Sequence, residues 1–190
     1  PARVLECARD NSDAVRGHRK QAEDNEALHT LDDWRETRFA EIEPLLAERR
    51  RNGCVHEGHG DLHLANLVLI GEVVLPFDAI EFNDALRWID TASDIAFLWM
   101  DLLHQRQPGL ANRFLSAWLD ASGDTTAPEV LPFFAAYRAL VRAKVAVIRS
   151  AQPGADVAAA QAEARAYLAL ALTISEPPAP PPVITPGLPA

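Results

Sequence analysis

Apolar side chains recur at helical spacing over most of the chain. The first clear set runs from Leu31 to Leu46 with a period near 3.6 residues, which buries one face of a helix. Asp32 or Asp33 can cap its start, and a basic run before Gly53 is typical of a helix end. Comparable patterns predict further helices over residues 88–103, 110–123, 128–149 and 153–175.

One stretch has a different pattern and predicts a β-hairpin. Residues 66–70 and 73–77 are short apolar runs, and Gly71 and Glu72 form a turn between them. We therefore expect an α+β fold that is mainly α-helical, with this hairpin packed on a helical bundle.

The two ends of the chain differ from its middle. Residues 1–30 are polar and have few large apolar side chains, so we expect a poorly packed or helical leading segment. Residues 176–190, EPPAPPPVITPGLPA, contain seven prolines and predict an extended linker. The packed domain is expected over residues 31–175, and both ends are expected to be cuts inside a longer protein.

Composition excludes several classes of function. The net charge of −9 and the pI near 5.1 argue against nucleic-acid binding, which needs a basic face. Cys7 and Cys54 form no disulfide or zinc pattern, which suits a reducing cytoplasm. No apolar run is long enough to cross a bilayer, so we expect a cytoplasmic protein with no membrane partner.

Three polar residues gather around the predicted hairpin. Asp61 precedes the first strand, Asn66 begins it, and Asp78 follows the second. Pairing of the strands brings Asn66 and Asp78 to one end, with Asp61 close in sequence. Two oxygen ligands for Mg²⁺ beside a free carboxylate are what phosphoryl transfer requires, because the carboxylate can orient and deprotonate an attacking hydroxyl.

These residues lie in a recognisable motif. The segment HGDLHLAN, residues 59–66, resembles the HGDxxxxN catalytic loop of aminoglycoside phosphotransferases and of the wider protein-kinase-like superfamily. The resemblance implies a kinase-like carboxy-terminal lobe, with Asp61 as catalytic base and with Asn66 and Asp78 as ligands of Mg²⁺ on ATP. It also implies that His59 and Asp94 support the loop. Asp78-Ala79-Ile80 stands where protein kinases have Asp-Phe-Gly.

The resemblance further implies parts that this chain does not contain. Residues 80–102 are similar to a bacterial subgroup in which such a lobe precedes a P-loop kinase-like domain. The chain has no GxGxxG, and Lys20 and Lys144 are its only lysines, so we expect the nucleotide-binding lobe to lie upstream. The isolated chain is then expected to be inactive. The implied substrate is a hydroxylated small molecule, and whether it is an aminoglycoside stays open.

Two other functions compete with this interpretation. The lobe could be a pseudokinase that regulates or docks a neighbouring domain. Alternatively, His56, His59, Asp61 and His63 imitate the metal-ligand cluster of metallohydrolases, although His104 is the only histidine downstream. His56 and His63 have no role in the kinase interpretation. The remaining acidic residues, which are Glu81, Asp84, Asp90 and Asp101, are expected to be solvated or ion-paired.

Overall fold

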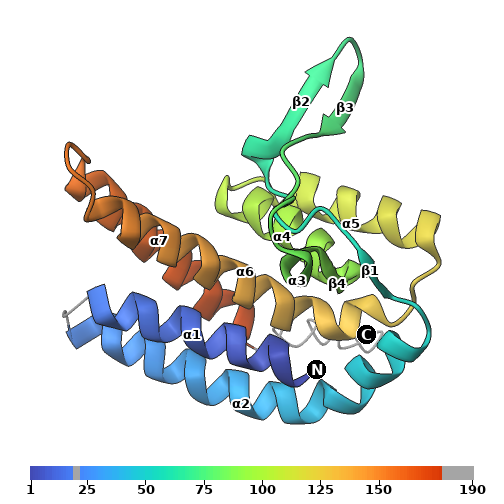
Figure 1. The fold of residues 1–190 in the computed structure, drawn as a ribbon, viewed down its shortest axis with the longest axis horizontal. Helices are drawn as coiled ribbons and strands as arrows, with labels where there is room; N and C mark the ends of the chain where they lie inside the picture. Colours follow the sequence, from blue (N-terminus) through green and yellow to red (C-terminus); the bar gives the residue numbers. More distant parts are fainter. Residues whose placement is uncertain (19–21, 177–190) are drawn as a thin grey trace, which may run out of the picture.

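The computed structural model describes residues 1–18 and 22–176, and it is mainly helical with two small antiparallel sheets of two strands each (Figure 1). This confirms the mainly helical α+β class. The helices are α1 (Ala2–His18), α2 (Ala22–Arg51), η1 (Leu64–Asn66, a 3₁₀ turn), α3 (Asp84–Arg87), α4 (Thr91–His104), α5 (Pro108–Ser122), α6 (Ala127–Ser150) and α7 (Val157–Ser175). The strands are β1 (Val55–Glu57), β2 (Leu67–Ile70), β3 (Val73–Pro76) and β4 (Trp88–Asp90).

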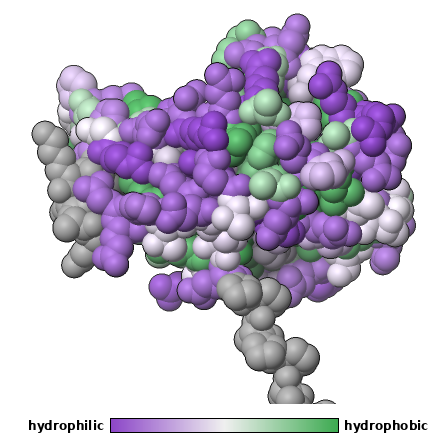
Figure 2. Space-filling model, turned by 90° about the horizontal axis from the view of Figure 1, so that it is seen from below, coloured by the Kyte–Doolittle hydropathy of each residue, from purple (hydrophilic) through white to green (hydrophobic). Residues whose placement is uncertain are grey.

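The core lies where α4, α6 and α7 pack together and α1 and α2 cover them (Figure 1). Alanines line much of α6 and α7, and their small side chains let the two helix backbones approach closely. Large buried side chains fill the rest, among them Leu28, Phe97, Met100, Phe133, Phe134 and Tyr167. In Figure 2, which views the molecule from the side of α1 and α2, the surface is mostly hydrophilic and apolar patches are small.

The N-terminal region, expected to be poorly packed or helical, is helical, and one face of α1 is buried. Ala8, Asn11, Ser12 and Val15 form a buried stripe on α1, and α2 begins at Ala22 rather than near Leu31. The stripe is hard to recognise in sequence because half of it is polar. Buried Ser12 accepts a hydrogen bond from Arg35, and Asn11 accepts one from Lys144, so tertiary partners offset the cost of burying polar atoms.

The predicted hairpin forms, with Leu67 paired to Pro76 and Ile70 paired to Val73. It does not pack on the bundle as expected, because it projects away from the helices (Figure 1). Leu69, Ile70, Val73 and Val74 are each more than half exposed, and Leu67 at the base joins a small apolar cluster with Leu98 and Leu102. Both faces of the hairpin are apolar, so its pattern gives neither face a preference for burial.

The second sheet was not predicted. Trp88–Asp90 was expected to begin a helix, but it forms β4 and pairs with β1, Val55 lying opposite Asp90. Three-residue strands are too short to show a period of two, and their pairing joins segments more than thirty residues apart in sequence. This sheet fixes the start of the segment that leads to Asp61.

A saturated ion cluster joins the end of α2 to the rest of the fold. The guanidinium of Arg49, which is 1% exposed, donates to both carboxylate oxygens of Asp90, to both of Asp124 and to Thr126 Oγ1, at 2.6–2.9 Å. Asp90 also caps α4 through the Ala92 N–H. Asp90 is therefore buried and ion-paired.

The predicted proline-rich linker, apart from Glu176, lies outside the described residues, as does Lys20. Within the described residues, no helix is both long and apolar enough to span a membrane.

Candidate functional site

The loop that carries Asp61 is held by a buried carboxylate. Asp94, in the first turn of α4, accepts hydrogen bonds from the backbone N–H groups of His59 at 2.7 Å and Gly60 at 2.9 Å. Gly60 has φ +82°, and a Cβ there would lie 2.7 Å from the Leu86 carbonyl oxygen. Glycine is required at residue 60 because only glycine tolerates both the left-handed backbone and this close approach.

Asp61 lies directly beside Asn66. The Asn66 side-chain amide donates to the Asp61 backbone oxygen at 3.0 Å and to Asp61 Oδ2 at 3.1 Å. Asn66 is buried, whereas the Asp61 side chain is 39% exposed. His63 Nε2 lies 3.4 Å from the same Oδ2. The His63 and Asn66 donors outweigh partial burial and hold the pKa of Asp61 below its ordinary value, so Asp61 is a carboxylate at neutral pH.

The segment after β3 runs back along this loop. The Phe77 N–H donates to the Asn66 oxygen, and the Ile80 N–H donates to the His59 oxygen, both at 3.0 Å. His59 Nε2 lies 2.9 Å from the Phe77 oxygen, while its Nδ1 accepts from the Asp61 N–H at 3.3 Å. Asp78 follows at once, exposed and with φ +60°. Asp61, Asn66 and Asp78 therefore come from adjoining segments at the base of the hairpin.

Two supporting residues escaped the sequence analysis. Arg138 of α6 is 5% exposed and donates to the Gly60 oxygen at 2.8 Å and to Ser93. Asp101 of α4, expected to be solvated or ion-paired, is buried and accepts from the Leu64 N–H at 2.9 Å and from the Tyr167 hydroxyl at 3.2 Å. The available signal was a charged residue inside an apolar helical repeat, which marks a buried polar contact when a partner lies nearby.

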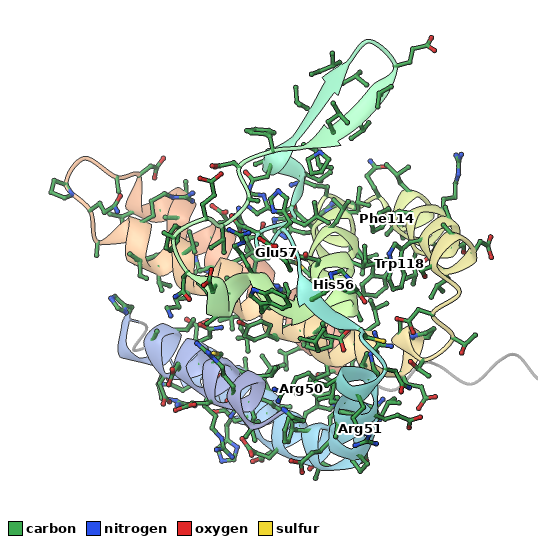
Figure 3. The ribbon with its side chains drawn as sticks, turned by 45° about the vertical axis from the view of Figure 1, so that its right-hand side comes forward. Arg50, Arg51, His56, Glu57, Phe114 and Trp118 are labelled. Carbon is green, nitrogen blue, oxygen red and sulfur yellow. The ribbon has the colours of Figure 1, made fainter. Side chains whose placement is uncertain are left out.

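The histidines do not form a metal cage. Among the described residues, no group of three or more His, Cys, Asp or Glu side chains is arranged to hold a metal ion. The ring nitrogens of His59 contact the Phe77 oxygen and the Asp61 N–H. Nδ1 of His63 accepts a hydrogen bond from the Ala65 N–H. His56 is exposed on β1 and lines an open depression with Trp118 and Asp124 (Figure 3). The metallohydrolase interpretation therefore lacks its ligand set.

A large cavity lies away from this loop. A cavity of about 550 Å³ lies between the start of α1, the end of α2 and β4, and its lining includes Arg3, Trp88, Tyr137 and Arg138. Asp61, Asn66 and Asp78 do not line it. Because Asp61 and Asp78 face the surface, the predicted site is an open edge of the molecule rather than a closed pocket.

Comparisons with known proteins give relatives but no function. The chain is 42% identical over 118 residues to uncharacterized proteins of Mycobacterium bovis (Mb2027c) and Mycobacterium tuberculosis (MT2060 and Rv2004c). The match covers 62% of this chain and 24% of each relative, so the chain spans about a quarter of their length. No protein-family model matches the chain. No solved structure gives a significant match.

Proposed function

We propose that the chain is the catalytic half of an ATP- and Mg²⁺-dependent phosphotransferase that acts on a hydroxyl group of a small molecule. The observation that carries the proposal is the contact between Asp61 and Asn66, with Asp78 on the adjoining segment. This arrangement supplies one partly exposed carboxylate beside two further side-chain oxygens, which is the set of groups that the HGDLHLAN motif implies.

In this proposal Asp61 is the catalytic base. One oxygen, Oδ2, is engaged by Asn66, and no hydrogen bond among the described residues uses Oδ1. Oδ1 can therefore accept the proton of a substrate hydroxyl while Oδ2 stays fixed. The depressed pKa keeps the carboxylate ionised and ready to accept that proton at neutral pH.

Asn66 and Asp78 are the proposed ligands of Mg²⁺. The Asn66 nitrogen is occupied by Asp61, which leaves its Oδ1 available for a cation, and Asp78 is an exposed carboxylate. Two protein oxygens suit Mg²⁺, which commonly keeps waters and phosphate oxygens as its other ligands. When bound, the ion neutralises charge on the transferred phosphoryl group.

The proposal also gives the exposed hairpin a partner. A two-stranded hairpin is at best marginally stable in water, and four of its side chains, Leu69, Ile70, Val73 and Val74, are each more than half exposed. In the proposal a nucleotide-binding lobe covers it. The relatives are about four times as long as the matched segment, which leaves room for such a lobe and for a P-loop domain.

The test is an ADP-release assay with full-length protein, ATP and Mg²⁺ against a panel of hydroxylated metabolites and aminoglycosides. Asp61→Asn is expected to lower turnover by roughly 10²- to 10⁴-fold, because it removes the base while keeping the side-chain shape. Residues 1–190 alone are expected to show no turnover.

Asp120→Asn is the matched control, because Asp120 is an exposed carboxylate on α5. It is expected to leave turnover unchanged. Circular dichroism and a melting curve check that both variants fold. Undiminished turnover of folded Asp61→Asn would exclude Asp61 as the base, and no turnover of full-length protein with any acceptor would favour the regulatory interpretation.

A further inference from the structure

His63 lies between Asp61 and Arg142. It is 6% exposed, and its ring packs against Phe97 with centroids 5.3 Å apart. Its Nδ1 accepts a hydrogen bond from the Ala65 N–H at 3.2 Å and so caps η1. Its Nε2 lies 3.4 Å from Asp61 Oδ2 and 3.4 Å from Arg142 Nη1. The two ring nitrogens therefore have different partners: Nδ1 contacts the loop backbone, and Nε2 lies near Asp61 and Arg142.

The cap determines which nitrogen carries the proton. Because Nδ1 accepts a hydrogen bond, the proton of a neutral ring must be on Nε2. The Arg142 guanidinium on the other side of Nε2 is held by the Tyr167 hydroxyl at 3.3 Å and by Glu163. With Nδ1 accepting from the Ala65 N–H, the ring nitrogen left to donate is Nε2, and it lies next to Asp61.

This arrangement concentrates donors on one oxygen of Asp61. Oδ2 receives the Asn66 amide at 3.1 Å and faces His63 Nε2 at 3.4 Å. The second separation is long for a hydrogen bond, as catalytic contacts often are before substrate binds. Two donors on the same side restrict rotation of the carboxylate and leave Oδ1 directed away from them.

We propose that His63 is a positioning residue that holds Asp61 so that Oδ1 is presented to the substrate hydroxyl. This rests on the proposed phosphotransferase function. His63 contacts neither substrate nor Mg²⁺ in this role, and it acts through the orientation of Asp61. A misplaced base costs rate because proton transfer requires close alignment of the reacting atoms.

The rival role for His63 is that of a capping and packing residue alone. Three substitutions separate the two tasks. His63→Asn keeps an acceptor near Nδ1, since asparagine is a good helix cap, but its amide is too short to reach Asp61. His63→Gln places an amide nitrogen near the former Nε2 and gives up the cap. His63→Met matches glutamine in length and donates nothing, so it is the control for His63→Gln.

The experiment measures ADP release by full-length protein with Mg²⁺-ATP, with water and with each acceptor of the panel used to test the proposed function. His63→Asn is expected to lower kcat by roughly 10- to 100-fold, with KM for ATP and melting temperature near those of the parent. His63→Gln is expected to have a kcat at least about tenfold above that of His63→Met. In an Asp61→Asn background, His63→Asn is expected to change kcat less than about twofold, because both residues act in one unit.

Each outcome decides the proposal. If the parent turns over ATP and His63→Asn matches it, or if Gln and Met variants lose activity equally, His63 is structural and the inference is overturned alone. If the parent and Asp61→Asn release ADP equally with every acceptor, both proposals are overturned together. Should His63→Asn fail to fold, the Gln and Met pair still decides, since both lack the cap.

Discussion

Two polar clusters in this molecule contain aspartate but are arranged in opposite ways: one surrounds Arg49, and the other joins Asp61 to Asn66 and His63. Around Arg49, five hydrogen bonds at 2.6–2.9 Å join one guanidinium to two carboxylates and a hydroxyl, and Arg49 is 1% exposed. Around Asp61, the two contacts to the carboxylate both lie on Oδ2, at 3.1 Å from Asn66 and 3.4 Å from His63, and the side chain is 39% exposed. Every N–H group of the Arg49 guanidinium has an acceptor, whereas Oδ1 of Asp61 accepts no hydrogen bond from the described residues.

The difference separates a buried ion pair from an accessible carboxylate. Burial opposes the charge of Arg49, but Asp90 and Asp124 more than offset it and raise its pKa above the ordinary value. All five hydrogen bonds of the Arg49 guanidinium go to these two carboxylates and to Thr126. Asp61 keeps a charge and a free oxygen at the surface, which is the condition for accepting a proton from a substrate. Because aspartate occurs in both clusters, the presence of an aspartate alone would not separate them.

The largest expected effect comes from breaking the saturated cluster. Arg49→Met should cost about 3–5 kcal/mol of unfolding free energy, because it leaves Asp90 and Asp124 with uncompensated charge. Urea denaturation measures the change. Arg50→Met, at the exposed neighbouring position, and Asp61→Asn should each stay within about 0.5 kcal/mol of the parent. An equal loss for Arg49→Met and Asp61→Asn would remove the distinction between the clusters.

A smaller effect is expected from crowding the loop that carries Asp61. Gly60→Ala places a Cβ 2.7 Å from the Leu86 oxygen, whereas Gly123→Ala, also at positive φ, meets nothing within 4 Å. The control should lose about 1 kcal/mol from backbone strain, and Gly60→Ala about 1–3 kcal/mol more from the forced shift. Melting curves of both variants test this. Equal losses would mean that the contact with residue 86 does not constrain the loop.

The smallest effect concerns acid pH. Arg49 holds the pKa of Asp124 below its ordinary value of 3.8, against the opposing effect of burial. A depressed folded-state pKa contributes stability that is complete above the unfolded value and is lost as pH falls through the folded value. Unfolding free energy measured from pH 6 to pH 2 should therefore drop below about pH 4, and Asp124→Asn should flatten that drop. An unchanged slope in Asp124→Asn would contradict the assigned pairing.

Parts of the fold and site could be predicted from sequence because their causes are local. Apolar periodicity located α5, α6 and α7 to within a few residues. Two β-prone runs on either side of Gly71 predicted the two strands of the hairpin. The spacing in HGDLHLAN brought Asp61 and Asn66 together because a five-residue turn has few ways to close. The proximity of Asp78 followed from strand pairing.

Other features depended on partners distant in sequence. Arg138 reaches Gly60 across 78 residues, and Asp101 reaches the Tyr167 hydroxyl across 66. The packed stripe of α1 is half polar and becomes a core face only because Arg35 and Lys144 satisfy Ser12 and Asn11. Such contacts leave no periodic trace in the chain.

The sequence by itself determined where the helices and the hairpin form, and which residues of the loop could take part in phosphoryl transfer. Helical and strand periods and a short motif are local properties, which the chain order alone specifies. Only the tertiary structure decided which charged residues are buried in ion pairs and which stay accessible. It also decided that the hairpin projects away from the helical bundle. Burial and hydrogen-bond saturation depend on segments that folding brings together, so one aspartate becomes a buried partner of Arg49 and another, Asp61, stays an accessible carboxylate.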